Sequence, residues 1–238
     1  MISSQSKSRV LVFAAHPDDE VLGCGGTIAY HRAKEEEVGV CYISEGVSSR
    51  FNFEDYKIRE KWEKEMFNRE EMAKNAASIL DFQIIDFLRL PNLRMNDINI
   101  LDIAKKLIKI IEKFKPDIVY VNFPGDMNSD HKVTFDSVFT ALRPSTHHNV
   151  KDILCYEVLS STEWAPSISK HNFQPNTFID ITNYFDTKIK SINAYNFEMR
   201  SEPHPRSKST IKSLCVFRGS QIGVKYAESF MSIRRLLK

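Results

Sequence analysis

The chain has 238 residues, 42% of them hydrophobic and 27% charged, and its formal net charge is +2. This length suffices for one domain with a sizeable core, while so small a net charge, with basic and acidic residues interspersed, argues against a nucleic-acid partner. No stretch is long and apolar enough for a membrane span, and the first ten residues lead into a strand without a signal-peptide core. The four cysteines are widely spaced, without a CxxC pair. We therefore expect one cytoplasmic domain over residues 1–238 with reduced thiols.

Short apolar runs alternate with helical patterns along the chain. The first run, residues 9–15, is apolar without alternation, which is typical of a strand buried on both faces of a parallel sheet. The alternation predicts an α/β fold with a Rossmann-like, doubly wound, mostly parallel sheet, helices on both faces and a C-terminal elaboration. Further strands are predicted at 38–43, 84–88, 118–122, 153–158 and 178–181, and helices at 20–34, 56–80, 98–114, 133–143, 184–197 and 219–234.

Two features of the predicted helices invite a functional interpretation that we do not adopt. The glycines at 23, 25 and 26 lack the G-x-G-x-x-G order of a phosphate-binding turn, so we expect them to allow close packing of the first helix against the sheet. The charges over residues 57–69 are of both signs, and we expect most of them to form a solvated helix face.

Metal-capable side chains follow the first strand directly. Pro17 fixes its own φ and biases His16 away from the helical region, so the strand ends there. Asp18, Asp19 and Glu20 then fall in the first turn of a helix, where the helix dipole favours negative charge. An acidic first turn would account for the carboxylates alone, but it does not account for the histidine in the same turn.

A second group of such residues follows the strand predicted at 118–122. There the chain passes through residues 126–131 (DMNSDH) into another helix. In an open parallel sheet, the loops after different strands converge outside the carboxyl ends of those strands. His16, Asp19 and His131 would then supply two imidazoles and one carboxylate, a set that suits a divalent metal and leaves positions for water and substrate.

These segments resemble the PIG-L/LmbE-type N-acetylglucosaminyl deacetylases. The resemblance rests on residues 15–20 (AHPDDE) and 126–131, with softer matches at 161–164, 203–207, 218–219 and 227–230, so it covers nearly the whole chain. It implies that His16, Asp19 and His131 bind Zn²⁺ and that Asp18 is the general base. It also implies the reaction, which is hydrolysis of the N-acetyl group of an amino sugar (a GlcNAc-type glycoside, nucleotide sugar or glycan precursor) with release of acetate.

The chemistry is consistent with this residue set. Without a serine or cysteine nucleophile, amide hydrolysis near pH 7 needs a group that activates water and polarises the carbonyl, and bound zinc does both. A carboxylate beside the metal can take the proton from water and return it to the departing amine. Asp18 has the right place, because the next residue, Asp19, is the one expected to face the metal.

The chain departs from the family pattern three residues before the second metal histidine. Many members have a histidine there, which can stabilise the tetrahedral oxyanion, whereas this chain has Asn128. Asn128 either holds the loop or is a weak oxyanion donor. His204, between two prolines, is a candidate for the missing role, either from the same chain or from a neighbouring subunit of a homo-oligomer.

Three further residues are expected to contact the substrate. Arg50 follows the end of the second predicted strand, where a guanidinium suits a phosphate or a carboxylate, although a surface position is an alternative. Trp164 would either stack on a sugar face or pack under the C-terminal region. Arg206 lies in the same segment as His204 and is the third expected contact.

Two other function classes remain open at this point. Two histidines and one carboxylate also describe an iron(II) oxygenase, but such enzymes usually place the His and the acid two residues apart on a β-rich scaffold, whereas His16 and Asp19 are three apart. A non-catalytic sugar- or nucleotide-binding α/β domain would be expected to lose a ligand or Asp18, and all are present. Nothing in the sequence identifies the group that carries the sugar.

Overall fold

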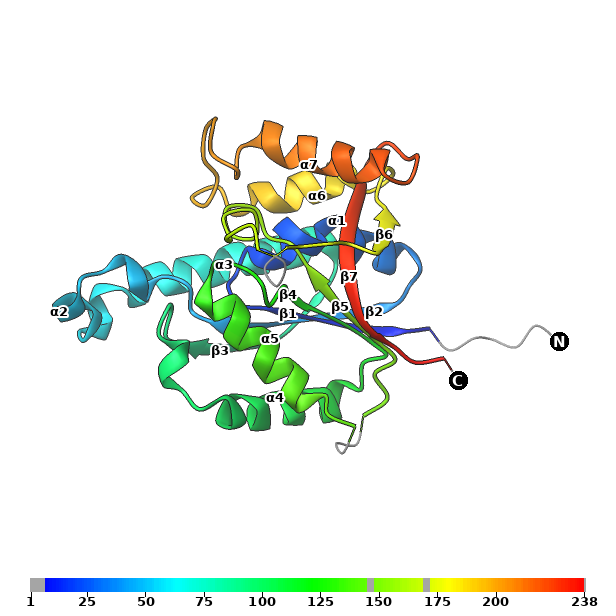
Figure 1. Ribbon diagram of the computed structural model, residues 1–238. Coiled ribbons are helices and arrows are strands. Elements are labelled where there is room, and N and C mark those ends of the chain that lie inside the picture. Colours follow the sequence, from blue (N-terminus) through cyan, green and yellow to red (C-terminus); the bar gives the residue numbers. More distant parts are fainter. Residues whose placement is uncertain (1–6, 145–147, 169–171, 238) are drawn as a thin grey trace.

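A computed structural model of the chain describes residues 7–144, 148–168 and 172–237. Its centre is a seven-stranded sheet in the order β3-β2-β1-β4-β5-β7-β6, with helices on both faces (Figure 1). The first five strands in this order are parallel, and β7 is antiparallel to both of its neighbours. The strands are β1 (Arg9–Ala14), β2 (Glu37–Ser44), β3 (Gln83–Leu90), β4 (Ile118–Asn122), β5 (Asp152–Tyr156), β6 (Thr177–Asp180) and β7 (Ala227–Arg235).

The unbroken apolar run of β1 is explained by burial on both faces. Val10, Val12 and Ala14 join the hydrophobic cluster on one side of the sheet, and Leu11 and Phe13 join the cluster on the other side. All five side chains are inaccessible to solvent. The doubly wound fold predicted from the sequence is therefore confirmed.

The helices form one layer on each face of the sheet. On one side lie α1 and α3, with α6 packed against both of them, and on the other side α4 packs against α5 (Figure 1). No helix in the described part of the chain is both long enough and apolar enough to cross a membrane. The helices are α1 (Asp19–Ala33), α2 (Phe53–Tyr56), α3 (Glu63–Leu80), α4 (Ile100–Phe114), α5 (Ser129–Ala141), α6 (Phe185–Asn193) and α7 (Lys208–Ser220), with short 3₁₀ turns at Ser48–Arg50, Arg59–Lys61 and Met95–Asp97.

The helix predicted over residues 219–234 is wrong. The chain instead forms α7 and then β7, which lies between β5 and β6. Ser207 caps α7, because its side chain accepts a hydrogen bond from Thr210 N. Apolar Tyr226 and Phe230 are four residues apart, a spacing that also occurs on a helix face. Pairing with strands on both sides satisfies the backbone of β7, and Phe230 is fully buried.

The helix predicted over residues 56–80 is interrupted at its start. α2 ends at Tyr56, Ile58 is extended, and α3 begins only at Glu63. The indole N–H of Trp62 donates to the Tyr56 carbonyl at 2.9 Å, which closes this bend. The α2 segment projects away from the sheet, as Figure 1 shows.

Close packing of α1 against the sheet is confirmed by its glycines. A Cβ on Gly23 would lie 2.2 Å from Cδ2 of Tyr156, and a Cβ on Gly26 would lie 2.7 Å from the Ile181 side chain. The Tyr156 ring leaves no room to move, because its hydroxyl donates to Phe13 O at 2.9 Å and lies 3.1 Å from Asn122 Oδ1. Because Gly23 and Gly26 have no side chain, α1 can lie this close to Tyr156 of β5 and to Ile181.

We predict that Gly23→Ala destabilises the protein, because the added methyl overpacks the contact with Tyr156. The expected loss is about 1–3 kcal/mol in the free energy of unfolding, measured by urea denaturation. Gly25→Ala is the matched control on the same helix, since its Cβ would come no closer than 3.2 Å to a neighbouring atom, Cγ of Lys188. Equal stability of the two variants would contradict this packing argument.

Candidate metal centre

The predicted metal ligands follow β1 and β4, the two central strands between which the strand order reverses. β1 and β4 are neighbours, but the chain leaves β1 toward β2 and leaves β4 toward β5, so the strand order reverses between them, which is where ligands bind in open α/β sheets. His16 and Asp19 follow β1, and His131 lies in the first turn of α5 after β4. α5 begins four residues before the predicted start, with Asn128 as its N-cap, whose Oδ1 accepts from Asp130 N at 2.9 Å.

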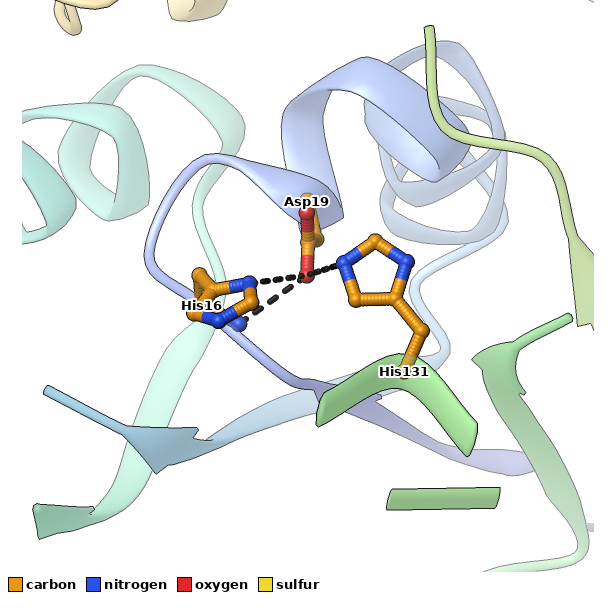
Figure 2. Close-up of side chains that lie close together, drawn as sticks. All are labelled: His16, Asp19 and His131. Carbon is orange, nitrogen blue, oxygen red and sulfur yellow. Dashed lines mark hydrogen bonds and ion pairs between the residues drawn. The ribbon is translucent and has the colours of Figure 1, made fainter. Parts of the chain in front are cut away.

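The side chains of His16, Asp19 and His131 point toward one another (Figure 2). One potential ligand atom from each residue lies within 4.8 Å of the others. Oδ2 of Asp19 is 3.5 Å from His16 Nδ1 and 3.3 Å from His131 Nε2. All three side chains are buried. The structure thus brings together the set that the sequence predicted.

A second carboxylate lies behind each imidazole. His16 Nε2 is 3.0 Å from Asp130 Oδ2, and His131 Nδ1 is 3.0 Å from Asp126 Oδ2. A carboxylate at this distance attracts the ring nitrogen that faces it, and it leaves the other ring nitrogen directed toward the cluster, where it can bind a metal. Asp126 is itself held by the Ser161 and Thr162 hydroxyls and by the Asn128 N–H.

The Asp19 carboxylate has unfilled bonding capacity. Its Oδ2 accepts from the His16 N–H at 2.9 Å and from Asn122 Nδ2 at 3.1 Å, whereas its Oδ1 is buried without a hydrogen-bond partner. A buried polar atom without a partner is costly and calls for an explanation. Two imidazole nitrogens beside this carboxylate form a donor set that fits a divalent cation such as zinc.

The charges within the cluster depend on one another. Burial lowers the pKa of the His131 imidazole, but Asp19 and Asp126 outweigh this effect and raise it to about 10. Burial likewise raises the pKa of the Asp19 carboxyl, yet His131 and His16 bring it well below its usual range. The carboxylates and imidazoles therefore stabilise each other's charged forms within this buried cluster.

Asp18 is held between two arginines beside this cluster. Its Oδ2 accepts from Arg69 Nη2 at 2.9 Å and from Arg206 Nη1 at 2.7 Å. Burial raises the pKa of Asp18, and these two guanidiniums offset only part of that shift. Its Oδ1 is buried and has no hydrogen-bond partner.

Two C-terminal site residues, His204 and Arg206, are connected to Asp18. Arg206 contacts Asp18, and its backbone N–H donates to His204 Nδ1 at 3.0 Å. The Trp164 ring meets the His204 ring edge-on at a centroid distance of 5.8 Å, and Trp164 is 51% exposed. Trp164 is thus not packed under the C-terminal region.

Arg50 reaches the same group of residues through Glu198. Its Nη2 donates to Glu198 Oε1 at 2.6 Å, and Glu198 also lies 3.5 Å from Arg69 and 3.7 Å from Arg206. Burial raises the pKa of Glu198, but Arg69 and Arg50 lower it by more than burial raises it, so that the net shift is downward. The Arg50 charge is therefore already paired within the chain.

Several residues of the site were missed by sequence reasoning. Arg69 and Glu198 carry no local signal, because each acquires its partners only through tertiary contacts. Arg69 belongs to the run of charges expected to form a solvated face; most of that face is exposed, but Arg69 is buried. Asp126 and Asp130 were recognised as parts of a motif, and their role behind the imidazoles emerges only from the geometry.

Sequence comparisons find a matching family model and a curated relative. Residues 11–142 match the family model described as PIG-L: GlcNAc-PI de-N-acetylase. The chain is 22% identical over 231 residues to diacetylchitobiose deacetylase of Thermococcus kodakarensis, with 92% of this chain and 81% of that protein covered.

Solved structures show the same fold. N,N'-diacetylchitobiose deacetylase of Pyrococcus horikoshii, in complex with an inhibitor, aligns with a TM-score of 0.76 at 22% identity, covering 97% of this chain and 85% of that one. The 4-carboxy-2-hydroxymuconate hydratase GalB of Pseudomonas putida aligns with a TM-score of 0.71 at 22% identity, covering 97% and 98%. Because proteins with different activities share this fold, the fold by itself does not select a reaction.

We predict that Asp126→Asn weakens metal binding, because the amide no longer supplies the charge that orients His131. The expected fall in zinc affinity is about 10–100-fold, measured by competition with a chromogenic chelator. Asp136→Asn makes the same change on an exposed position of α5 and should leave the affinity unchanged. Equal zinc affinities of the Asp126→Asn variant and the wild type would rule out this supporting role.

Proposed function

The chain belongs to the PIG-L family of GlcNAc-PI de-N-acetylases, and on that premise we propose that it is a zinc-dependent hydrolase of N-acetylated amino sugars. The observation that carries the proposal is the carboxylate of Asp18, with a bare Oδ1, next in the chain to a buried His–Asp–His cluster. The similarity to diacetylchitobiose deacetylase supports a GlcNAc-type sugar as the substrate.

His16, Asp19 and His131 would hold the cation. When bound there, zinc supplies a Lewis acid for the amide carbonyl and lowers the pKa of water. Asp18 is placed to accept a proton from the attacking water at Oδ1 and to return it to the departing amine nitrogen. The burial that raises the pKa of Asp18 suits a group that must both take and give a proton.

Two side chains can donate to the oxyanion of the tetrahedral intermediate. Asn128 uses its Oδ1 to cap α5, which leaves its Nδ2 as the donor. His204 accepts at Nδ1 from Arg206 N, so the proton of its ring is carried by Nε2. We assign His204 to the site of its own chain, because Arg206, two residues on, contacts Asp18 of that chain.

Trp164, Arg50 and Arg206 are proposed to shape the sugar site. Trp164 offers a half-exposed ring beside His204, which suits stacking on a pyranose face. Arg50 and Arg206 share Glu198, and Arg206 also contacts Asp18, so they present hydrogen-bond donors whose charge is largely neutralised. This arrangement suits recognition of sugar hydroxyls.

The alternatives receive less support from the fold and the site. The α/β sheet differs from the β-rich scaffold usual for facial-triad oxygenases, and the bare Asp18 Oδ1 has no evident task in a binding domain. Because a hydratase has the same fold, the proposal is tested by measuring which reaction the protein catalyses. Acetate release should be measured with N-acetylglucosamine, N,N'-diacetylchitobiose and UDP-N-acetylglucosamine; no release from any of them by zinc-loaded protein would overturn the proposal.

We predict that Asp18→Asn retains zinc but lowers kcat by roughly 10²–10⁴, because the amide keeps the shape of the side chain and cannot accept the proton. Acetate release and metal content are measured on the same preparation. Simultaneous loss of metal and activity would instead make Asp18 a ligand or a structural acid.

A further inference from the structure

The turn that carries Asp18 has a strained backbone. Asp18 has φ 124° and ψ −26°, a region that side-chain-bearing residues rarely adopt. Such a conformation persists only when the surrounding structure imposes it, and it is found preferentially at functional sites. The Asp18 N–H donates to Glu20 Oε2 at 3.0 Å, which fixes one side of the turn.

A single guanidinium fixes the other side. Arg69 projects from α3 and donates from Nε to Pro17 O at 2.9 Å, from Nη1 to Gly46 O at 2.5 Å and from Nη2 to Asp18 Oδ2 at 2.9 Å. Its side chain is 7% exposed. Arg69 thus ties the β1–α1 turn to the loop that follows β2.

The loop after β2 is built to admit this side chain. Gly46 has φ 75°, and a Cβ there would lie 3.1 Å from Cζ of Arg69. Glycine therefore serves both the backbone conformation and the close approach of the guanidinium. Burial lowers the pKa of Arg69, but Asp18 and Glu198 raise it overall, so the charge is retained in the interior.

The two oxygens of Asp18 consequently have different surroundings. Oδ2 accepts from both Arg69 and Arg206, whereas Oδ1 is buried without a hydrogen-bond partner. Arg206 donates only to the carboxylate of Asp18 in this turn, whereas Arg69 donates both to that carboxylate and to the backbone carbonyl of Pro17. Arg69 is therefore the residue that controls both the backbone and the carboxylate.

We propose that Arg69 is the positioning residue for Asp18: it imposes the strained turn at Pro17–Asp18 and engages Oδ2, so that Oδ1 is the oxygen that accepts the proton. This inference rests on the proposed function of Asp18 as the base. Lysine cannot replace this arginine, because three separate nitrogens of the guanidinium engage the three acceptors, and lysine offers a single nitrogen.

The kinetic test compares Arg69→Lys with the wild type, using acetate release from N-acetylglucosamine and N,N'-diacetylchitobiose. Because a displacement of about 1 Å can cost about 10²-fold in rate, we expect kcat to fall by about 10–10²-fold. The metal content should be unchanged, and KM should change by less than about threefold, since Arg69 is buried and is not among the residues proposed to contact the sugar. Unchanged kcat would overturn the proposal.

A double-mutant cycle separates positioning from a general structural effect. If Arg69 acts through Asp18, then Arg69→Lys in an Asp18→Asn background should lower kcat further by less than about threefold. A full and independent loss in that background would mean that Arg69 acts by another route, and it would contradict the proposal.

A structural test does not depend on turnover. Crystal structures of Arg69→Lys and Arg69→Met are compared with that of Arg89→Met, which removes a guanidinium paired with Glu70, the neighbour of Arg69 on α3. In both Arg69 variants we expect Asp18 to leave the positive-φ region or its Oδ1 to take a new partner, with the turn unchanged in the control. An unchanged Asp18 in Arg69→Lys would refute the inference. This result stands even if neither sugar is hydrolysed, an outcome that would refute the proposed function separately.

Discussion

The parallel pairing of β1 with β4 is the constraint on which the site depends. Val10–Phe13 lie in register with Ile118–Val121, so the segments after the two strands emerge at the same edge of the sheet. Residues more than a hundred positions apart are thereby brought within reach of one ion. The burial of β1 on both faces holds this edge in place, because any shift of the strand would disturb both hydrophobic clusters.

Asn122 connects the sheet to the charged cluster by hydrogen bonds. It ends β4, accepts the Ala15 N–H at 2.9 Å and donates to Asp19 Oδ2 at 3.1 Å. The Tyr156 hydroxyl of β5 lies against the same amide, and Gly23 lets α1 approach that tyrosine. Gly23, Tyr156 and Asn122 thus connect the packed core to the Asp19 carboxylate by direct contacts. These contacts hold the buried carboxylate in one position between the two imidazoles.

The sequence was informative wherever a local pattern reflects the final environment. The buried strands, the acidic turn after Pro17 and the convergence of His16, Asp19 and His131 all follow from chain periodicity and from the rule for parallel sheets. The prediction failed at β7, where Phe230 follows Tyr226 at a helical spacing, but Phe230 is buried in a strand paired on both sides and Tyr226 stacks on Phe185. It also gave no hint of Arg69 on Asp18 or of Glu198 among three arginines, because charges in a polar run are buried only through tertiary contacts.

X-ray diffraction from crystals of zinc-loaded protein, collected just above and just below the zinc absorption edge, tests the central claim most directly. We expect one anomalous peak in the described part of the chain, bonded to His16 Nδ1, His131 Nε2 and the Asp19 carboxylate at about 2.0–2.2 Å. A strong peak elsewhere with this cluster empty, or no bound zinc in protein purified with the metal, would contradict it.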